Sequence, residues 1–219
     1  MYQSHRALLG DRLWTALLHL APERPREARS LLLRQGDPAT HVLVLCSGSV
    51  AVTRRDGRGQ RTLLAVRGAG ELLGELSLLD GGVRSATVIA AGPCRVHTVP
   101  APDFEAFVSE HRLMHALTRH AVGRIRESEE IRQELATAPA PARLAAALLR
   151  LAEASGQPAV LPVHIGLTQE ELAQLIGTSR NSVVHSLSPW RAEGWIRAAP
   201  GGGLVLEHLD GLRRVVGPR

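Results

Sequence analysis

The sequence predicts an α+β chain in which an antiparallel β domain is followed by a long helix and then by a small helical module. Three observations predict this order. Short apolar runs separated by glycine-rich turns fill the first half, an apolar pattern with a helical period follows, and two short helices joined by a glycine come last. With 219 residues, 44% of them hydrophobic, the chain is long enough to bury a core.

Six short apolar runs between Ala28 and Pro100 predict the strands of an antiparallel barrel or sandwich. They recur at intervals of roughly eight to twelve residues, and turn sequences such as Asp56-Gly57 separate them. The runs are Ser30–Leu33, His41–Cys46, Ser49–Thr53, Arg61–Val66, Thr87–Ala90 and Arg95–Val99.

A long helix is predicted after Asp103, which we expect near the helix start. Its apolar positions alternate in steps of three and four residues, the a/d pattern of a coiled coil, so we expect two subunits to meet along it. The alternative is that this helix packs against its own barrel. The residues of this predicted seam are Met114, Leu117, Ala121, Arg124, Ser128, Ile131 and Leu135.

Two prolines, Pro139 and Pro141, predict the end of this helix, because proline removes a backbone donor and an interior proline costs ~3 kcal/mol. We interpret the segment as a hinge. A second amphipathic helix is expected over Arg143–Ala154, and a short strand over Val160–Ile165.

The last sixty residues contain the pattern of a helix-turn-helix. The segment Thr168–Glu171 is a capping box that opens a first helix. Ala173 is small enough for close helix crossing, Gly177 permits the tight turn, and Val183 fills the space between the helices. Any helical hairpin is the alternative.

The second helix of this motif is expected to begin at Thr178 or Ser179. Because Pro189 inside it would clash with the carbonyl of His185, we expect this helix to end near Leu187 and Ser188 to cap a new helical segment with Pro189 at its first position. A hairpin of Trp195–Ala199 and Leu204–Glu207 follows, which makes the module a winged helix.

The start of the second helix carries polar side chains that could contact DNA. Arg180 can bind guanine and Asn181 can bind adenine in the major groove, and His185 follows one turn later. Hydroxyl and amide groups at the two helix starts suit phosphates. These are Thr168, Gln169, Ser179 and Ser182.

A second motif lies in the β domain, where Leu73–Asp80 is followed shortly by Arg84-Ser85-Ala86-Thr87. A helix that starts at Gly74 offers free N–H groups to a phosphate, the Arg84 guanidinium neutralises its charge, and Ser85 adds a hydroxyl. Glu75 could then accept a ribose hydroxyl. The alternative is that Glu75 and Arg84 form a structural ion pair.

This second motif resembles the phosphate-binding cassette of cyclic-nucleotide-binding domains. Together with Gly48–Val52 upstream and the winged helix downstream, the chain resembles the CRP/FNR superfamily of bacterial regulators from about Leu31 to Leu206. The resemblance implies a β-roll or jelly-roll cyclic-nucleotide-binding domain in residues 1–108, a coiled-coil dimerisation helix in 109–138 and a winged helix-turn-helix in 139–219.

The resemblance also assigns roles within the nucleotide site. The sugar-phosphate residues are Gly74, Glu75, Leu76, Arg84, Ser85 and Ala86. On the long helix, Arg124 and Ser128 would contact the base from the same subunit. Glu129 stands where the family has a hydroxyl that reaches across from the partner, which is a departure from its pattern.

The function implied is a homodimeric transcriptional regulator controlled by a cyclic nucleotide, with cyclic AMP as the expected effector and RNA polymerase as a further partner. Its DNA would be an approximately palindromic duplex. Two alternatives remain: a ligand-independent regulator with a vestigial pocket, and a sensor of another small effector, for which ten histidines leave haem open. No enzymatic motif such as GxSxG or HExxH is present, so we expect no catalytic residue.

Charge and cysteine content exclude further classes. Basic residues outnumber acidic ones by 26 to 21, which weakly favours polyanionic partners. Cys46 and Cys94 are too few for a four-thiolate iron–sulfur or zinc site, and we expect no metal.

No apolar run approaches the ~18 residues of a membrane span, and Met1–Gly10 lacks a secretory signal, so we expect a cytoplasmic protein without a membrane partner.

Overall fold

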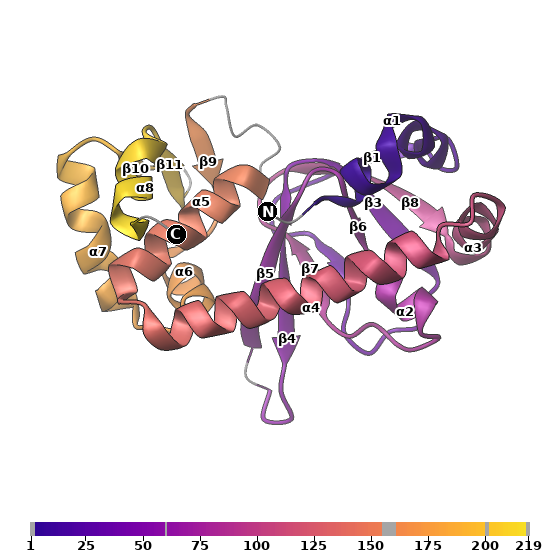
Figure 1. Ribbon diagram of the computed structural model, residues 1–219, viewed down its shortest axis with the longest axis horizontal. Coiled ribbons are helices and arrows are strands. Elements are labelled where there is room, and N and C mark those ends of the chain that lie inside the picture. Colours follow the sequence, from indigo (N-terminus) through magenta and orange to yellow (C-terminus); the bar gives the residue numbers. More distant parts are fainter. Residues whose placement is uncertain (1–2, 60, 155–160, 200–201, 218–219) are drawn as a thin grey trace.

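The computed structural model describes residues 3–59, 61–154, 161–199 and 202–217, and its elements form two lobes that a long helix connects (Figure 1). The N-terminal lobe is a β-roll of two four-stranded antiparallel sheets. One sheet has the order β1 (Glu23–Arg26), β8 (Cys94–Pro100), β3 (His41–Ser47), β6 (Glu71–Leu73). The other has the order β2 (Leu31–Leu33), β7 (Thr87–Ala90), β4 (Ser49–Arg55), β5 (Arg61–Gly68).

All six apolar runs that predicted strands are strands, within one or two residues at their ends. Strands β1 and β6 were not predicted. The β1 sequence contains no apolar residue other than Pro25, and β6 has only three residues, so neither gives a two-residue period to detect. Both lie at edges of the same sheet, where pairing with β8 and β3 places them.

Helix α1 (His5–Leu18) packs against the β-roll and was not predicted either. Ser4 caps it, because its side chain accepts a hydrogen bond from the Ala7 N–H. Trp14 and Leu17 of this helix join a core cluster with Phe104 of α3 (Ala101–Glu110), which covers the same end of the roll.

Helix α4 (Met114–Thr137) runs along most of the length of the molecule, across the β-roll and on to the C-terminal lobe (Figure 1). The predicted seam does not all face outward: Leu117 is 2% exposed in the core of its own roll, and Leu135 packs against the C-terminal core. The large apolar side chains that α4 leaves exposed are Met114, Val122 and Ile125. The alternative, that the helix packs against its own barrel, therefore holds for Leu117. The exposed apolar face of α4 is formed by Val122 and Ile125.

The proline segment forms a short connection between two helices. Helix α5 begins at Ala140 and ends at Ala154, so Pro141 lies in its first turn and Pro139 lies in the connection. Across this bend Arg143 Nη1 donates to the Leu135 carbonyl at 2.8 Å. Farther along, Arg150 forms two hydrogen bonds with the Glu134 carboxylate. The two helices therefore fold back on each other.

The C-terminal lobe is a winged helix-turn-helix. It contains α6 (Gln169–Leu175), α7 (Arg180–Ala192), α8 (Leu209–Val216) and a three-stranded sheet of β10 (Ile196–Ala198), β11 (Leu204–Leu206) and β9 (Val163–Ile165). The predicted hairpin is confirmed by the β10–β11 pairing. Val160 and Pro200-Gly201 of the predicted strand and turn lie outside the described residues.

Our prediction that the second helix ends near Leu187 was wrong, because α7 continues through Pro189 to Ala192. Leu187 and Trp190, on either side of the proline, are 0% and 4% exposed. Burial of two large side chains outweighs the backbone hydrogen bond that proline cannot donate.

The two lobes share one hydrophobic core. Ala51 and Leu63 of the β-roll belong to the cluster that contains Leu172 of α6 and Leu187 of α7. Gly68 of β5 lies so close to α5 that an added Cβ would come within 1.3 Å of the Ala154 carbonyl oxygen. None of the described helices combines the length and the apolarity that crossing a bilayer requires.

Candidate functional site

The predicted cassette folds as a short helix that glycine opens. Helix α2 (Glu75–Leu79) follows Gly74, whose φ of 85° is the left-handed conformation that glycine adopts without strain. A Cβ at Gly74 would lie 2.5 Å from Arg84 Nη1. Glycine is therefore required here twice, for backbone conformation and for the approach of the guanidinium.

Arg84 is a buried cation that backbone carbonyls surround. It is 3% exposed, its Nη1 donates to the Gly74 carbonyl at 2.6 Å, and its Nη2 donates to the His41 carbonyl. Among the described residues no carboxylate lies within ion-pair distance of it, so the predicted alternative of a direct Glu75–Arg84 ion pair is not found. Burial lowers the pKa of Arg84, and an anion would relieve that penalty.

A cavity of about 250 Å³ borders Arg84. Of the predicted nucleotide residues, Arg84 is the one that lines it, while Ser85 is exposed and Ala86 is half-buried. The other lining residues come from the β2 region and the loop before β3: Leu31, Leu32, Leu33, Arg34, Asp37, Pro38, Thr40 and His41.

Glu75 points into the protein and away from solvent. It is 8% exposed, and its Oε1 lies 3.7 Å from His5 Nε2 of α1. Burial raises the pKa of Glu75 to about 7, and the neighbouring Glu71 adds to this. Leu76, the next cassette residue, is 44% exposed.

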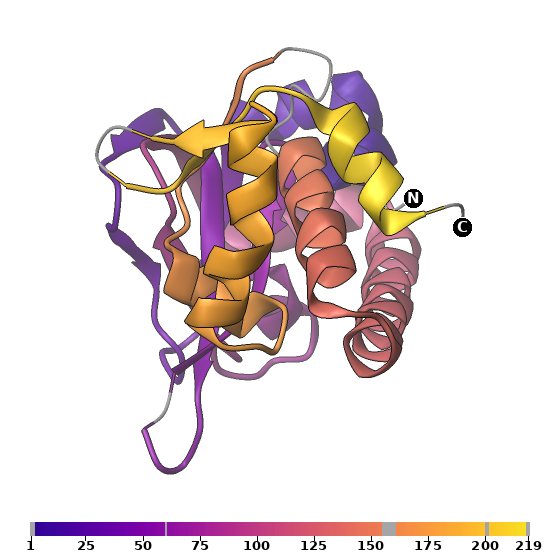
Figure 2. The ribbon, with the colours of Figure 1, turned by 90° about the vertical axis from the view of Figure 1, so that its left-hand side faces the viewer.

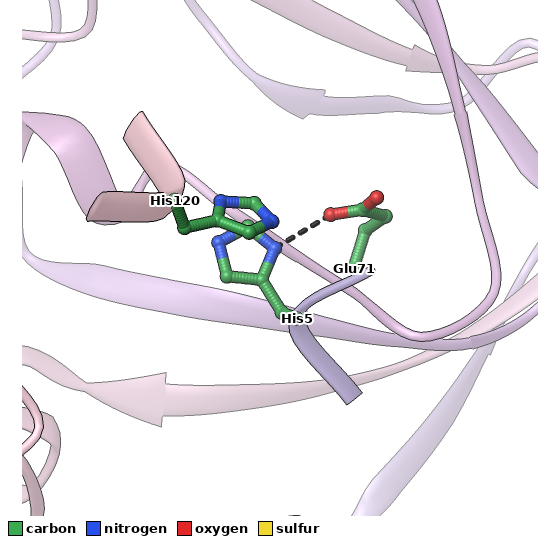
Figure 3. A group of neighbouring side chains, drawn as sticks. All are labelled: His5, Glu71 and His120. Atoms are coloured by element: carbon green, nitrogen blue, oxygen red, sulfur yellow. Dashed lines mark hydrogen bonds and ion pairs between the residues drawn. The ribbon is translucent and has the colours of Figure 1, made fainter. Parts of the chain in front are cut away.

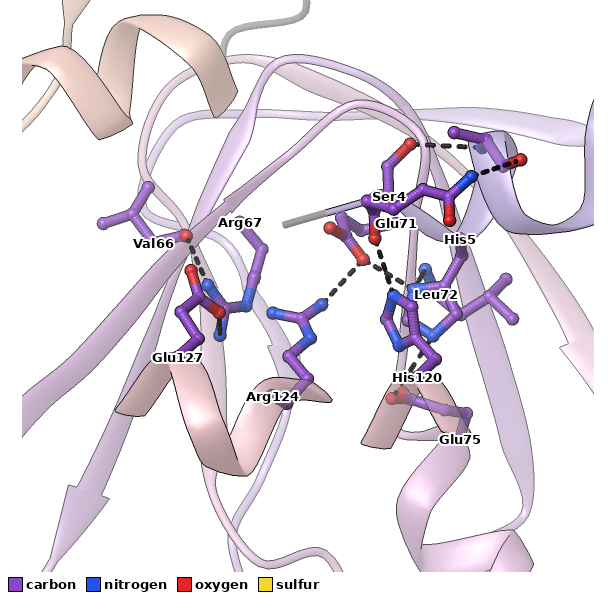
Figure 4. Close-up of polar contacts among 12 residues, drawn as sticks. Ser4, His5, Val66, Arg67, Glu71, Leu72, Glu75, His120, Arg124 and Glu127 are labelled. Atoms are coloured by element: carbon purple, nitrogen blue, oxygen red, sulfur yellow. Dashed lines mark hydrogen bonds and ion pairs between the residues drawn. The ribbon is translucent and has the colours of Figure 1, made fainter. Parts of the chain in front are cut away.

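Glu71, next to the cassette, is the centre of a buried polar network that joins α1, β6 and α4 (Figure 4). His5 Nδ1 accepts the Leu72 N–H at 3.2 Å and lies 2.5 Å from Glu71 Oε2. A contact this short between a ring nitrogen and a carboxylate oxygen requires one proton between them, and the imidazole tautomer determines which of the two atoms donates it. Burial raises the pKa of Glu71 to about 7 and lowers that of His5 to about 3.

The side chains of His5, Glu71 and His120 converge, with potential ligand atoms within 4.8 Å of one another (Figure 3). Two histidines and a carboxylate are a ligand set that zinc and iron use. Their polar atoms already have partners, however: His120 Nε2 contacts the Gln3 carbonyl at 3.0 Å, and Arg124 Nη2 donates to Glu71 at 2.7 Å. The geometry supports a hydrogen-bonded network better than a metal centre.

The predicted base-contacting residues of α4 differ in their surroundings. Arg124 is half-buried and directed to Glu71, whereas Ser128 and Glu129 are exposed. Glu129 follows Ile125 by four residues and therefore lies on the exposed apolar face of α4. The structure thus places Arg84 against Gly74, directs Glu75 toward His5, and leaves Ser128 and Glu129 on the helix surface.

His5, Glu71 and His120 were not predicted from the sequence as site residues. The apolar spacing of Leu9, Leu13 and Leu17 could have predicted helix α1. No local signal pairs His5 with Glu71, which lies 66 residues away.

The helix-turn-helix has the local geometry that its residues predicted. Ala173 and Val183 are 1% and 0% exposed, and Gly177 has a φ of 61°. Thr168 and Glu171 form a complete capping box, and Ser179 caps α7. Of the residues predicted to contact DNA, Gln169 and Ser182 are half-buried, and the others are exposed: Thr168, Ser179, Arg180, Asn181 and His185.

Comparison with known proteins agrees with both halves of this geometry. Residues 23–111 match the family described as cyclic nucleotide-binding domain, and residues 142–215 match the Crp-like helix-turn-helix domain. The chain is 31% identical over 166 residues to the CRP-like cAMP-activated global transcriptional regulator of Mycobacterium tuberculosis, covering 74% of each protein. It is 35% identical over 168 residues to the cyclic AMP receptor protein of Thermus thermophilus, covering 76% of each.

The chain belongs to the CRP/FNR family of transcriptional regulators. It is a DNA-binding regulator with a cyclic-nucleotide-binding domain, and its family is one of transcription regulators and not of enzymes. Among solved structures, a CRP/FNR-family regulator from Thermus thermophilus is 27% identical, with a TM-score of 0.67 over 90% of this chain and all of that one. FixK2 from Bradyrhizobium japonicum, at 19% identity and a TM-score of 0.73, covers 91% of this chain and 98% of its own and shares the fold.

Proposed function

We propose that this CRP/FNR-family regulator acts as a homodimer whose DNA binding is controlled by a cyclic nucleotide, with cyclic AMP as the effector. In this proposal residues 1–108 sense the nucleotide, 109–138 dimerise and 139–219 bind an approximately palindromic duplex. RNA polymerase, a partner that the resemblance implied, remains part of the proposal.

The observation that carries the nucleotide proposal is the buried guanidinium of Arg84. It lies against Gly74 at the start of the cassette, without a carboxylate in ion-pair distance among the described residues, and beside a cavity. A cyclic phosphate supplies the missing negative charge and can accept two parallel hydrogen bonds from one guanidinium. The cyclic AMP receptor protein of Thermus thermophilus, 35% identical, supports the choice of cyclic AMP.

Two residues would have to rearrange on binding. Arg84 would exchange at least one carbonyl contact for the phosphate, and Glu75 would turn from His5 toward the ribose. Because Glu75 belongs to the same buried network as Arg124 of α4, its movement offers a route from the cassette to the dimerisation helix. In the proposal the resulting change in α4 alters the spacing of the two α7 helices, which must be ~34–36 Å apart to enter successive major grooves.

Calorimetric titration with cyclic AMP and cyclic GMP tests the proposal. We expect the wild-type protein to bind cyclic AMP and Arg84→Lys to bind it about tenfold or more weakly, because lysine cannot form the bidentate contact. Lysine retains the charge and can still donate to a backbone carbonyl, so the fold should survive. Arg12→Lys, an exposed position on α1, is the matched control and should bind like the wild type. Absence of binding by the wild type would contradict nucleotide control.

A further inference from the structure

The hairpin formed by β4 and β5 carries a concentration of positive charge that the cassette and the helix-turn-helix do not explain. Residues 54–61 contain four arginines, Arg54, Arg55, Arg58 and Arg61, against one acidic residue, Asp56. All four arginines are exposed. The hairpin projects from the body of the molecule, at the lower edge of both ribbon views (Figure 1 and Figure 2).

Two of these arginines face each other across the ladder. Arg55 is the direct partner of Arg61, and like charges directly opposite each other destabilise a strand pair. Among the described residues, no carboxylate lies within ion-pair distance of any of the four arginines. The hairpin therefore places two like charges opposite each other without an ion pair to either in the described part of the chain, a pattern expected where a ligand supplies the opposite charge.

Side-chain hydrogen bonds hold the backbone at Arg55 and Arg58. Gln35 clamps Arg55, because its Oε1 accepts the Arg55 N–H at 2.8 Å and its Nε2 donates to the Arg55 carbonyl at 3.1 Å. At the turn, the Asp56 side chain accepts the Arg58 N–H at 2.9 Å. The charges are thus presented on a defined surface.

Register places the facing pair on the side of the helix-turn-helix. Thr53 and Leu63 are partners two residues from Arg55 and Arg61, so all four side chains share one sheet face. Leu63 on that face belongs to the core that includes Leu172 of α6, and α6 packs against β5. Arg55 and Arg61 therefore lie on the same sheet face that contacts the DNA-binding module, farther along the hairpin than the residues of the shared core.

We propose that this arginine hairpin is a second DNA-contacting surface, which binds phosphates of the duplex outside the base pairs that α7 contacts. Guanidinium groups bind phosphates in bidentate geometry and read no sequence when they do so. The turn between α6 and α7 lies on the same lower side of the molecule as the hairpin (Figure 2), so a duplex engaged by α7 would pass on that side. The inference rests on the proposed recognition of DNA by α7.

The test measures how DNA affinity depends on salt. A duplex selected by the wild-type protein from random sequence, and the same duplex extended by about one helical turn on each side, are titrated with Arg55→Ser/Arg61→Ser at several salt concentrations. On the extended duplex we expect the slope of log K against log salt to fall by about 1 for each arginine removed that contacts a phosphate. On the short duplex we expect no change. Removal of a repulsive pair should leave the fold intact.

The matched control is Arg12→Ser/Arg24→Ser, which removes two exposed arginines from α1 and β1. An equal loss in both variants would show a bulk charge effect and overturn the proposal. An unchanged salt slope of the hairpin variant on the extended duplex would overturn the proposal too. This would hold even if the variant lost the binding of an acidic protein. If the wild type selects no sequence, the assignment of α7 fails instead, which distinguishes the two failures.

Discussion

Arg29 of the β-roll and Glu171 of α6 join the two lobes by a bidentate contact. Arg29 Nη1 and Nη2 donate to the two oxygens of the carboxylate at 2.6 and 3.3 Å. The same carboxylate accepts the Thr168 N–H at 2.8 Å, as part of the capping box of α6. Burial alone would raise the pKa of Glu171, but the hydrogen bonds from Arg29 and Thr168 lower it overall. One side chain therefore both completes the capping box of the first helix of the helix-turn-helix and ties that helix to the β-roll.

This double role predicts unequal effects of two alanine substitutions. Glu171→Ala removes the carboxylate half of the capping box and the contact between lobes, and should lower the free energy of unfolding by about 1–2 kcal/mol, although the Thr168 hydroxyl can still accept the backbone N–H of residue 171. Arg29→Ala removes only the contact between lobes, which is half exposed, and should cost less than about 1 kcal/mol. Urea unfolding of both variants measures the difference. Equal losses would mean that the cap contributes nothing beyond the ion pair.

The exposed apolar face of α4 predicts where a dimer interface can be broken. Ile125→Glu places a charge at a side chain that is 60% exposed in the single chain, so it should leave the folded chain intact and prevent association. Sedimentation should give a dimer for the wild type and a monomer for this variant. Glu130→Lys, exposed on another side of α4, is the control and should remain dimeric. A dimeric Ile125→Glu would place the interface elsewhere.

The exposed start of α7 predicts base recognition by Arg180. Arg180→Ala should cost ~1–3 kcal/mol of binding free energy on a selected duplex and little on random DNA, because a bidentate base contact discriminates while a phosphate contact does not. Competition binding with both kinds of DNA measures this. Arg213→Ala, at an exposed arginine of α8, should change neither. Similar losses on all DNA would reassign Arg180 to the phosphates.

The raised pKa of Glu75 predicts a pH-dependent stability difference. Burial raises this pKa to about 7 from 4.5, so the folded protein binds a proton that the unfolded chain releases between these values. The resulting stabilisation is complete below about pH 4.5 and is lost as pH rises through about 7. In Glu75→Gln the amide does not titrate, so the stability of the variant relative to the wild type should increase between pH 5 and 8, by on the order of 2 kcal/mol.

Urea unfolding at several pH values checks this prediction. His5 and His120 are present in both proteins, so their own titration largely cancels from the difference. Glu130→Gln, at an exposed site, is the control for the loss of one carboxylate. A pH-independent difference for Glu75→Gln would mean that Glu75 remains ionised in the fold throughout this range.

Local spacing in the sequence was sufficient to predict most elements. Short apolar runs bounded by turn residues, such as His41–Cys46, predicted strands, and the capping box at Thr168 with Gly177 predicted the helix-turn-helix, because local hydrophobic pattern and backbone conformation are set by near neighbours. The same local rules failed at Pro189, where burial of Leu187 and Trp190 decides that α7 continues. They also failed at Leu117, because the apolar period of the helix does not determine whether this side chain packs against a second subunit or against its own β-roll.

The cassette shows, within one site, which features follow from the sequence and which depend on the tertiary structure. Its glycine, acid and arginine were recognisable from the order of residues, since a left-handed turn and a charge are properties of one position and its neighbours. That Glu75 faces His5, that Arg84 donates to carbonyls, and that Glu71 shares a proton with a histidine 66 residues away were decided by the tertiary structure alone. Burial of whole surfaces selects partners that are distant in the chain, and low dielectric then determines which of the buried groups carry charge.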